Sequence, residues 1–343
     1  MVDKAGFGLI GCGVMGKVHA RVFASSPSVR FVSACDQDEE RAERFAREHG
    51  AEKHLTGWRE VVEDPAVDAV AIVTPDFAHE EIVQAALATG KNILVEKPLA
   101  TTVAACERIV EAHKKQGGKL MVNFGNRWNI PFVNLSAALE QGKLGDLQMI
   151  NIRLNDTRYV PEKMLNWAAR SSPAHFLGSH VVDLIRWLSG AEVARVYSVS
   201  RSVVLKQGGI DTPDFFQSIL ELTSGATAVV ENCWIVNESS PSVYDFQCEF
   251  VGSTGSAYIN TSHHGMITMY TSDGMAFPDV SGAPDLYGKP VGFAAAAVEH
   301  FIDCVVGDRQ PIVTAVDGLR AAEAVWAMDE SARRREPVVL RDQ

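Results

Sequence analysis

The sequence predicts an α/β protein: a doubly wound parallel sheet at the N-terminus, followed by an α+β domain with a large, mostly antiparallel, open sheet. Three observations lead to this fold class. Up to residue 124, short apolar runs alternate with helical patterns, as in parallel strands joined by right-handed helical crossovers. After residue 125, strands of alternating polarity follow one another through tight turns such as 223–225. The opening segment, residues 7–36, has the order strand, glycine turn, helix, strand and acid.

Length and composition fit two domains of ordinary size. The chain has 343 residues, of which 46% are hydrophobic and 22% are charged. We expect a first domain over residues 1–125 and a second over 126–343, with the C-terminal helix able to pack back on the first domain.

Charge and cysteine usage exclude several classes of protein. The net charge of −11 disfavours a nucleic-acid partner or an anionic membrane surface. No apolar run is long enough to cross a bilayer, and the first strand starts too early to leave room for a signal peptide. The six cysteines are scattered without zinc spacing, so we expect no metal site and a reducing, cytoplasmic environment.

Six residues form the glycine turn after the first apolar run: Gly11, Cys12, Gly13, Val14, Met15 and Gly16. Gly11 permits a tight turn, Gly13 lets the backbone approach a pyrophosphate, and Gly16 lets the next helix pack closely on the strand. The helix N-terminus then presents N–H groups and a partial positive charge to the phosphates. The pattern predicts a Rossmann dinucleotide-binding domain, and the alternative is an ordinary glycine-rich turn.

Asp36 closes the second apolar run, twenty residues after Gly16. A carboxylate at this offset can accept hydrogen bonds from the adenosine ribose, and it would repel the 2′-phosphate of NADP. We therefore expect NAD as the cofactor, with NADP less favoured. Arg41 and Arg44 on the next helix are the residues that would weaken this preference.

Helices and strands are expected to alternate through the rest of the first domain. The expected helices are 38–49, 79–88 and 101–116, and the expected strands are 67–75, 92–95 and 120–124. Sheets of this kind bind ligands beyond the carboxyl ends of their strands. Asp36, Thr74-Pro75, Glu96-Lys97-Pro98 and residues 123–127 all lie at such ends, which predicts one crevice there.

The second domain is expected to be an antiparallel sheet accompanied by helices. The expected strands are 148–155, 196–204, 215–222, 226–236, 244–251 and 257–260, and the expected helices are 131–141, a part of 171–188, 293–306 and 315–333. A sheet with one face uncovered commonly buries that face on another copy. We therefore expect a homodimer or a homotetramer.

Two side chains are candidate catalytic groups. Lys97 lies at the end of a buried strand, where a lysine costs desolvation unless it has a partner or a task. The alternative for Lys97 is a simple ion pair with Glu96. His180 would share a helix face with Asp183. A helix histidine can equally be a satisfied core group, and Asp183 can pair with Arg186 instead.

Four motifs occur in the order and spacing of the Gfo/Idh/MocA oxidoreductases, which the chain resembles from near residue 5 to the C-terminus. They are the glycine turn with Asp36, Thr74-Pro75-x-x-x-His79, Glu96-Lys97-Pro98 and Gly178-x-His180-x-x-Asp183. The resemblance implies a nicotinamide cofactor and hydride transfer at a carbinol or keto carbon of a sugar, cyclitol or related polyol. It also implies that Lys97 positions the reacting hydroxyl and the nicotinamide ribose, and that His180 is the general acid/base.

The resemblance also assigns binding residues. Beyond the glycine turn and Asp36, cofactor contacts are expected from Thr74, Pro75, His79, Glu96, Lys97 and Asn123. Substrate contacts are expected from Arg127, Asp156, Trp167, Asp183 and Trp234. For both tryptophans the alternative is core packing.

One position departs from the family pattern. Many members have an aspartate four residues before the histidine, whereas this chain has Phe176. His175, Asp156 or Tyr159 could replace that carboxylate, and spacing does not choose among them. Two other functions therefore stay open: a glycosidase that uses tightly held NAD in a transient oxidation, and a non-catalytic nucleotide-bound sugar sensor. Reduction of a keto sugar would differ only in direction.

Overall fold

The computed structural model describes residues 4–262, 266–272 and 274–340. By its internal contacts the chain divides into two compact units. The first consists of Met1–Asn129 and Ser281–Leu319, and the second of Ile130–Val280 and Arg320–Gln343. The sequence placed residues 281–319 in the second domain, whereas they cluster with the first unit.

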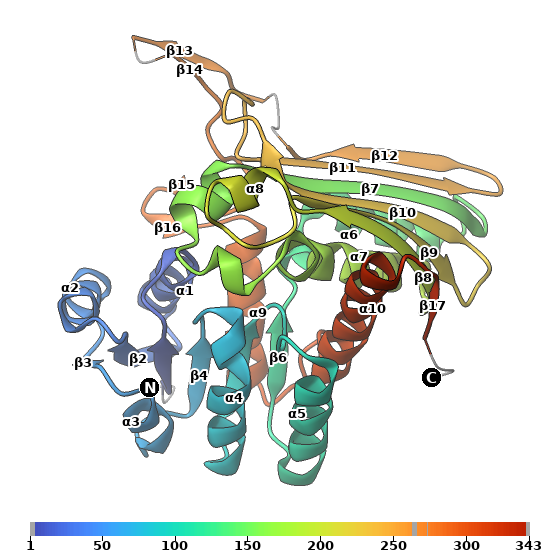
Figure 1. Cartoon of the computed structure of the whole chain (residues 1–343). Coiled ribbons are helices and arrows are strands. Elements are labelled where there is room, and N and C mark those ends of the chain that lie inside the picture. The colour runs from blue at the N-terminus through green and yellow to red at the C-terminus, as the bar shows by residue number, and fades with distance from the viewer. Residues whose placement is uncertain (1–3, 263–265, 273, 341–343) are drawn as a thin grey trace. The chain divides into compact units, whose positions relative to one another are not determined.

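Within the described residues, the first unit is built on a six-stranded parallel sheet in the order β3-β2-β1-β4-β5-β6 (Figure 1). Its strands are β1 (Ala5–Ile10), β2 (Val29–Cys35), β3 (Lys53–Leu55), β4 (Ala69–Ile72), β5 (Asn92–Glu96) and β6 (Leu120–Asn123). The central strands are almost wholly buried, as strands covered on both faces must be. The predicted doubly wound parallel sheet is confirmed. The short edge strand β3 had no clear signal in the sequence.

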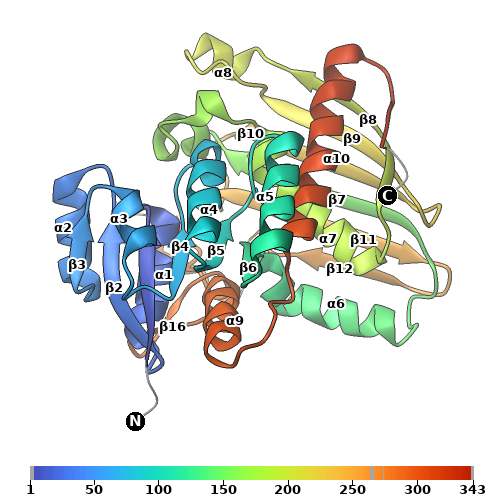
Figure 2. The same ribbon diagram turned by 90° about the horizontal axis from the view of Figure 1, so that it is seen from below.

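Helices flank this sheet (Figure 2). They are α1 (Val14–Ser25), α2 (Glu39–His49), α3 (Trp58–Glu63), α4 (His79–Ala88), α5 (Val103–Gln116) and α9 (Phe293–Val306). The helix α1 contacts α2 and α9, whereas α3, α4 and α5 contact one another in that order. Because α9 also packs on β5 and β6, its segment clusters with the first unit.

The second unit contains a seven-stranded sheet in the order β12-β11-β7-β10-β9-β8-β17. Its strands are β7 (Leu147–Thr157), β8 (Val193–Arg201), β9 (Phe215–Leu222), β10 (Thr227–Val236), β11 (Tyr244–Gly252), β12 (Ser256–Asn260) and β17 (Val338–Val339). The strands β7 and β10 pair in parallel, and the other neighbours are antiparallel. The expected mostly antiparallel sheet is therefore confirmed, with one parallel pair.

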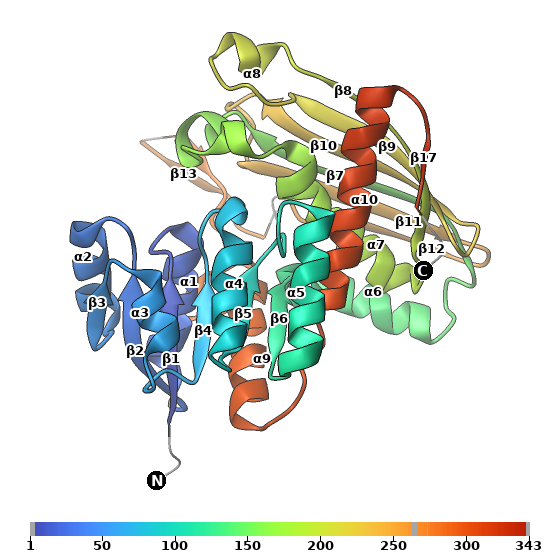
Figure 3. The same ribbon diagram turned by 60° about the horizontal axis from the view of Figure 1, so that its bottom comes forward.

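Helices cover one face of the second sheet (Figure 3) and leave the other open (Figure 1). They are α6 (Ile130–Glu140), α7 (Ser179–Ser189) and the Arg320–Arg334 part of α10 (Ala315–Arg334). On the open face, Met149, Tyr197, Ile219, Val229 and Tyr258 are all more than 40% exposed.

Shorter elements complete the described residues. They are α8 (Val204–Gln207), the hairpins β13 (Met269–Thr271) with β14 (Gly274–Ala276) and β15 (Asp285–Leu286) with β16 (Lys289–Pro290), and the helical turns η1 (Asp76–Ala78), η2 (Gly125–Trp128), η3 (Val160–Met164), η4 (Ala168–Arg170) and η5 (Ala174–Gly178). The strand expected over 196–204 ends at Arg201 because the Asp214 carboxylate accepts the N–H groups of Val203, Val204 and Leu205, which starts α8. In the described part of the chain, no helix combines the length and apolarity that a membrane span requires.

Candidate functional site

The glycine turn between β1 and α1 has the geometry that its sequence predicts. Gly11 has a φ of +111°, and a Cβ atom there would lie 2.4 Å from the Val73 carbonyl oxygen. A Cβ atom at Gly16 would lie 2.2 Å from the Gly11 carbonyl oxygen. At Gly13, apart from its chain neighbours, no described atom lies within 4 Å of such a Cβ position. The turn is therefore closely packed at Gly11 and Gly16 and open at Gly13, which fits the approach of a pyrophosphate to the N-terminus of α1.

The Asp36 carboxylate is fixed beside this turn. Its Oδ2 accepts the N–H of Cys12 at 3.1 Å, and its Oδ1 accepts the N–H of Asp38 at 3.1 Å. The Arg41 Nη1 lies 3.3 and 3.4 Å from the two Asp36 oxygens, and Nη2 donates to Asp38 at 3.1 Å. Backbone donors thus orient the predicted ribose acceptor, and a cation stands next to it.

Parallel pairing brings the predicted site residues of the first unit to one edge of its sheet. Ile10 lies beside Cys35 and Ile72, and Glu96 lies beside Asn123. At or directly after these strand ends come Asp36, Thr74, Pro75, Glu96, Lys97 and Asn123. The edge is the one at which doubly wound sheets bind their ligands.

Glu96 is a buried carboxylate with two side-chain partners. His19 Nε2, from α1, lies 3.0 Å from Glu96 Oε1, and Asn123 Nδ2 donates to the same oxygen at 2.8 Å. Burial acts to raise the pKa of Glu96, but His19, Asn123 and the charge of Lys97 hold this pKa below its ordinary value. The sequence analysis did not select His19, although its place three residues after Gly16, on the buried face of α1, was a usable signal.

His79 is the first residue of α4 and is only 1% exposed. Its Nδ1 lies 2.7 Å from the Pro98 carbonyl oxygen, and its Nε2 lies 3.0 Å from the Thr74 carbonyl oxygen. Burial lowers the pKa of His79, while the two carbonyls, Asp76 and Glu96 act to raise it. Because both ring nitrogens face backbone carbonyls, this geometry does not support the direct cofactor contact predicted for His79.

Lys97 lies between these two anchored neighbours. Its side chain is half-buried, it directly follows β5, and its peptide bond to Pro98 is cis. Its positive charge acts on Glu96, as the predicted alternative of an ion pair requires. That carboxylate also has His19 and Asn123 as partners, so Lys97 is one member of a cluster rather than half of an isolated pair.

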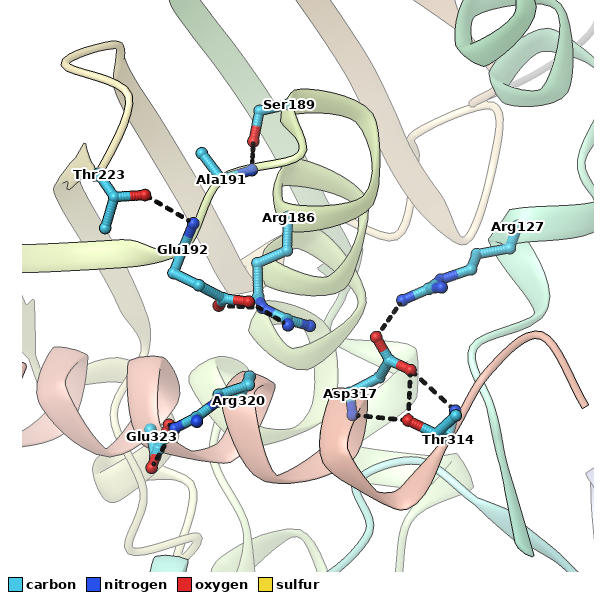
Figure 4. Close-up of polar contacts among 10 residues, drawn as sticks. All are labelled: Arg127, Arg186, Ser189, Ala191, Glu192, Thr223, Thr314, Asp317, Arg320 and Glu323. Atoms are coloured by element: carbon cyan, nitrogen blue, oxygen red, sulfur yellow. Dashed lines mark hydrogen bonds and ion pairs between the residues drawn. The ribbon is translucent and has the colours of Figure 1, made fainter. Parts of the chain in front are cut away.

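Arg127, a predicted substrate contact, is held inside the first unit (Figure 4). It is 8% exposed, and its Nη2 donates to Asp317 Oδ1 at 2.9 Å. The N–H and the hydroxyl of Thr314 each donate to the other Asp317 oxygen at 2.8 Å. Burial acts to raise the pKa of Asp317, and Arg127 with Thr314 holds it below its ordinary value. The guanidinium therefore has a structural partner within the first unit, and its contact with a substrate stays a prediction.

In the second unit, α7 carries His180 and Asp183 one turn apart, as predicted. Asp183 is 0% exposed, whereas His180 is half-buried. Arg186, the alternative partner of Asp183, donates through two nitrogens to Glu192 at 2.6 Å each (Figure 4). The helix ends at Gly190, whose φ of 64° gives the left-handed cap that glycine adopts readily.

Phe176 packs between two indole rings. Its ring centroid lies 6.1 Å from that of Trp167 and 5.8 Å from that of Trp234. Trp234 is 0% exposed, and its Nε1 donates to Asp156 Oδ2 at 3.2 Å. Trp234 offers no surface for stacking on a sugar, which corrects that prediction, whereas Trp167 is half-buried.

The three residues considered as substitutes for an acid at position 176 have different surroundings. His175 Nδ1 lies 3.3 Å from Asp329 and 3.0 Å from the Ser172 hydroxyl. Asp156 accepts from Trp234, and Tyr159 is 42% exposed. No single residue of the three is favoured by its contacts.

No group of three or more His, Cys, Asp or Glu side chains in the described ranges is arranged to hold a metal ion. The six cysteines all lie in those ranges, and none forms a disulfide.

Two family models match the chain. Residues 5–124 match the Gfo/Idh/MocA model, described as an oxidoreductase family with an NAD-binding Rossmann fold. Residues 132–258 match the Gfo/Idh/MocA C-terminal domain.

Curated relatives and solved structures agree with the models. The NAD⁺-dependent scyllo-inositol 2-dehydrogenase of Bacillus subtilis strain 168 is 30% identical over 339 residues, 97% of this chain and 95% of that protein. An inositol 2-dehydrogenase of Rhizobium meliloti strain 1021 is 29% identical over 321 residues, 92% of this chain and 93% of that protein. The crystal structure of myo-inositol 2-dehydrogenase from Lactobacillus plantarum has a TM-score of 0.86 at 21% identity, over 99% of this chain and all of that one. This chain therefore belongs to the Gfo/Idh/MocA family of oxidoreductases, whose N-terminal part is an NAD-binding Rossmann fold.

Proposed function

We propose that this protein is an NAD(H)-dependent dehydrogenase that transfers a hydride between nicotinamide and a carbinol or keto carbon of a sugar, cyclitol or related polyol. The observation that carries the proposal is the position of Lys97, at the same sheet edge as the glycine turn and Asp36. The two relatives named above are inositol dehydrogenases, which supports a polyol as the substrate.

The chain itself has to move the hydroxyl proton. When bound, the nicotinamide supplies the hydride acceptor. Histidine suits proton removal near neutral pH because its ordinary pKa is about 6.5. We assign this role to His180, half-buried at the start of α7, and the orientation of the hydroxyl to the ammonium group of Lys97. For reduction of a ketone, the same imidazole would return the proton.

The predicted substrate contacts of the second unit divide by exposure. Trp167 is the half-buried member of the aromatic cluster, and we propose it as the surface on which the apolar face of a sugar ring stacks. Asp156 and Asp183 are at most 5% exposed. We propose that these two carboxylates mainly orient neighbouring side chains, and that only a few of their atoms contact the substrate.

The role of Lys97 is tested by its substitution with alanine. A panel of sugars, cyclitols and sugar acids is first screened with NAD and NADP for absorbance of the reduced cofactor. On the best substrate, Lys97→Ala should lower kcat by about 100-fold or more, since a misplaced hydroxyl costs that much. The NAD dissociation constant should stay within about threefold, because the phosphates and the adenosine ribose bind elsewhere. Lys115→Ala, on the exposed face of α5, is the matched control.

Three outcomes would contradict the role of Lys97 or the proposed dehydrogenase function. Unchanged turnover in Lys97→Ala would remove its role. Binding of NAD and a polyol without any reduced cofactor would indicate a sensor. Release of free sugar from a glycoside without net NADH would identify a glycosidase.

The role of His180 is tested by the pH dependence of the reaction. In the oxidation direction, kcat/KM of the wild type should rise with pH through a single ionisation as the imidazole becomes a base. His180→Gln should be slow and should lose that ionisation. A profile that keeps the same ionisation in His180→Gln would assign the base to another residue.

We further propose that the open face of the second sheet pairs with a second copy. Its exposed apolar side chains are Met149, Tyr197, Ile219, Val229 and Tyr258. The first four alternate with buried side chains along β7, β8, β9 and β10. Light scattering at micromolar concentration should give a dimer or a tetramer, and Ile219→Glu with Tyr258→Glu should give a smaller species. The exposed substitution Glu111→Lys on α5 should not. A monomeric wild type would refute the proposal.

A cytoplasmic location belongs to the same proposal. It is supported by six cysteines that form no disulfide, as expected in a reducing compartment. Cell fractionation of the tagged full-length chain would test it, and recovery outside the cytoplasm would contradict it.

A further inference from the structure

Both neighbours of Lys97 in the chain are fixed by buried histidines from two different helices. Before it, Glu96 Oε1 lies 3.0 Å from His19 Nε2 of α1. After it, the Pro98 carbonyl oxygen lies 2.7 Å from His79 Nδ1 of α4. The two histidines are 0% and 1% exposed. Neither ring is accessible to a ligand, yet each contacts the residue next to the proposed catalytic lysine.

The two nitrogens of each imidazole ring have different hydrogen-bonding surroundings. His79 Nδ1 faces Pro98, and His79 Nε2 lies 3.0 Å from the Thr74 carbonyl oxygen. A carbonyl can only accept, and a neutral imidazole has one N–H, so His79 donates to one of the two carbonyls. We assign the donor to Nδ1, which makes the shorter contact. In His19 the order is reversed: Nε2 faces Glu96, whereas Nδ1 has no hydrogen-bond partner among the described residues.

Burial of two imidazoles at a strand end costs free energy unless hydrogen bonds compensate it. A buried polar group must be matched by a partner, and an apolar side chain of similar size would avoid that requirement. Both helices instead place a histidine beside a chain neighbour of Lys97: His79 contacts the backbone carbonyl of Pro98, and His19 contacts the side-chain carboxylate of Glu96. Lys97 itself is half-buried. The position that its ammonium group can reach depends on where the backbone holds its Cα.

We propose that His19 and His79 are positioning residues that together set the place of the Lys97 ammonium group. His79 acts through the Pro98 carbonyl and His19 through the Glu96 carboxylate. The inference rests on the proposed function of Lys97 and adds two residues that touch neither substrate nor cofactor. It replaces the cofactor contact predicted for His79 from the sequence.

Amide side chains separate the two nitrogens of each ring. The Asn amide nitrogen takes approximately the place of Nδ1, and the Gln amide nitrogen that of Nε2. His79→Asn therefore keeps the hydrogen bond to Pro98, whereas His79→Gln loses it and faces the Thr74 carbonyl instead. At position 19 the pattern inverts, because His19→Gln keeps the bond to Glu96 and His19→Asn loses it.

We expect kcat to be at least tenfold lower in His79→Gln than in His79→Asn, and at least tenfold lower in His19→Asn than in His19→Gln. Each position-79 variant can donate to one of the two carbonyls, as the neutral imidazole does, so their thermal midpoints should be similar and their NAD dissociation constants close. A general penalty for glutamine or for asparagine cannot give opposite orders at two positions. His113→Asn, which alters an outer histidine bonded to the Gly118 carbonyl, is the control and should leave kcat unchanged.

A second measurement does not depend on any substrate. Reductive methylation of Lys97 by formaldehyde and cyanoborohydride, followed by mass spectrometry, reports how freely its amine moves. We expect faster labelling in His79→Gln and His19→Asn than in their partners. If one variant fails to fold, the two variants at the other position still test the positioning role, by their labelling rates as well as by kcat.

The outcomes separate this inference from the function on which it rests. A wild type that oxidises no polyol would refute the proposed function. An active wild type in which the two members of each pair have equal kcat and equal labelling would refute the positioning role alone. Loss of kcat that follows the thermal midpoint across all four variants would reduce both histidines to structural residues.

Discussion

The Asp36 carboxylate and the Arg41 guanidinium lie side by side, and we predict that together they set the preference between NAD and NADP. Asp36 is held by the N–H groups of Cys12 and Asp38, whether or not Arg41 is present. The Arg41 Nη1 lies 3.3 Å from Asp36, and its side chain is 48% exposed. We therefore predict that Arg41→Ala and Asp36→Ala change the affinities for NAD and NADP in opposite ways.

The magnitudes follow from exposure and from charge. An exposed ion pair contributes about 0.2–1 kcal/mol, so Arg41→Ala should change the NAD dissociation constant by about fivefold at most. Hydrogen bonds to a charged group contribute about 1.5–3 kcal/mol, so Asp36→Ala should weaken NAD by about 10- to 150-fold. For NADP the order reverses: Arg41→Ala removes a cation that would face the 2′-phosphate, and Asp36→Ala removes the repelling charge. The NAD/NADP preference should rise in Arg41→Ala and fall in Asp36→Ala.

Calorimetric titration of the full-length chain with each dinucleotide, at low and at high salt, measures both affinities. The matched control is Arg47→Ala, an exposed arginine in the last turn of the same helix. The effect of Arg41 on NADP should weaken with salt, as the interaction between exposed charges does. The reasoning fails if the wild type binds NADP as tightly as NAD, or if Arg41→Ala weakens NAD as much as Asp36→Ala.

Three further predictions concern the same unit. Arg127→Met should destabilise it by about 3–5 kcal/mol at pH 7. The lowered pKa of Asp317 gives stability that is present above its unfolded pKa, about 3.9, and is lost as the pH falls below that value, so this deficit should shrink in urea unfolding at about pH 3. Gly16→Ala should lower the thermal midpoint, because the added Cβ would clash with the Gly11 carbonyl oxygen. Gly13→Ala should leave the thermal midpoint unchanged, because the Cβ position at Gly13 is open, and it should abolish NAD binding by filling the space that the pyrophosphate needs. Thr74→Val should weaken NAD by about fivefold without loss of stability, whereas Ser33→Ala should leave NAD binding unchanged.

Much of the first unit could be predicted because its signals are local. The apolar runs, the spacing from Gly11 to Gly16 and the acid at Asp36 place the turn and the sheet edge without knowledge of distant contacts. The position of Lys97 followed from the end of one apolar run. Even the burial of Trp234 was readable, because the period of a strand puts it on the covered face of β10 with Val230 and Asn232.

Side-chain partners far away in the sequence could not be predicted. Arg127 was predicted to contact a substrate, and the sequence contained no sign of its acceptor Asp317, which is separated from it by 190 residues. His79 was assigned to the cofactor, but the direction of its ring depends on the Pro98 carbonyl of the next strand end. A motif gives the identity of a side chain and its element. Which way the side chain points is decided by packing between elements, and a single sequence does not contain that information in local form.

The distribution of buried polar atoms in the first unit separates structural from functional demands. Thr74 Oγ1, Asn123 Oδ1 and Ser33 Oγ are all buried without a hydrogen-bond partner among the described residues. A buried oxygen without a hydrogen-bond partner is unfavourable wherever it lies. The lack of a partner alone therefore does not distinguish a ligand-binding oxygen from one left unpaired by packing. Ser33 lies in the middle of β2, where no ligand can reach it, and it is a cost of packing. Thr74 and Asn123 lie at strand ends on the edge that carries Lys97, and only there can a bound nucleotide compensate the cost. Position along the strand therefore decides which of these oxygens supports the predicted cofactor contacts.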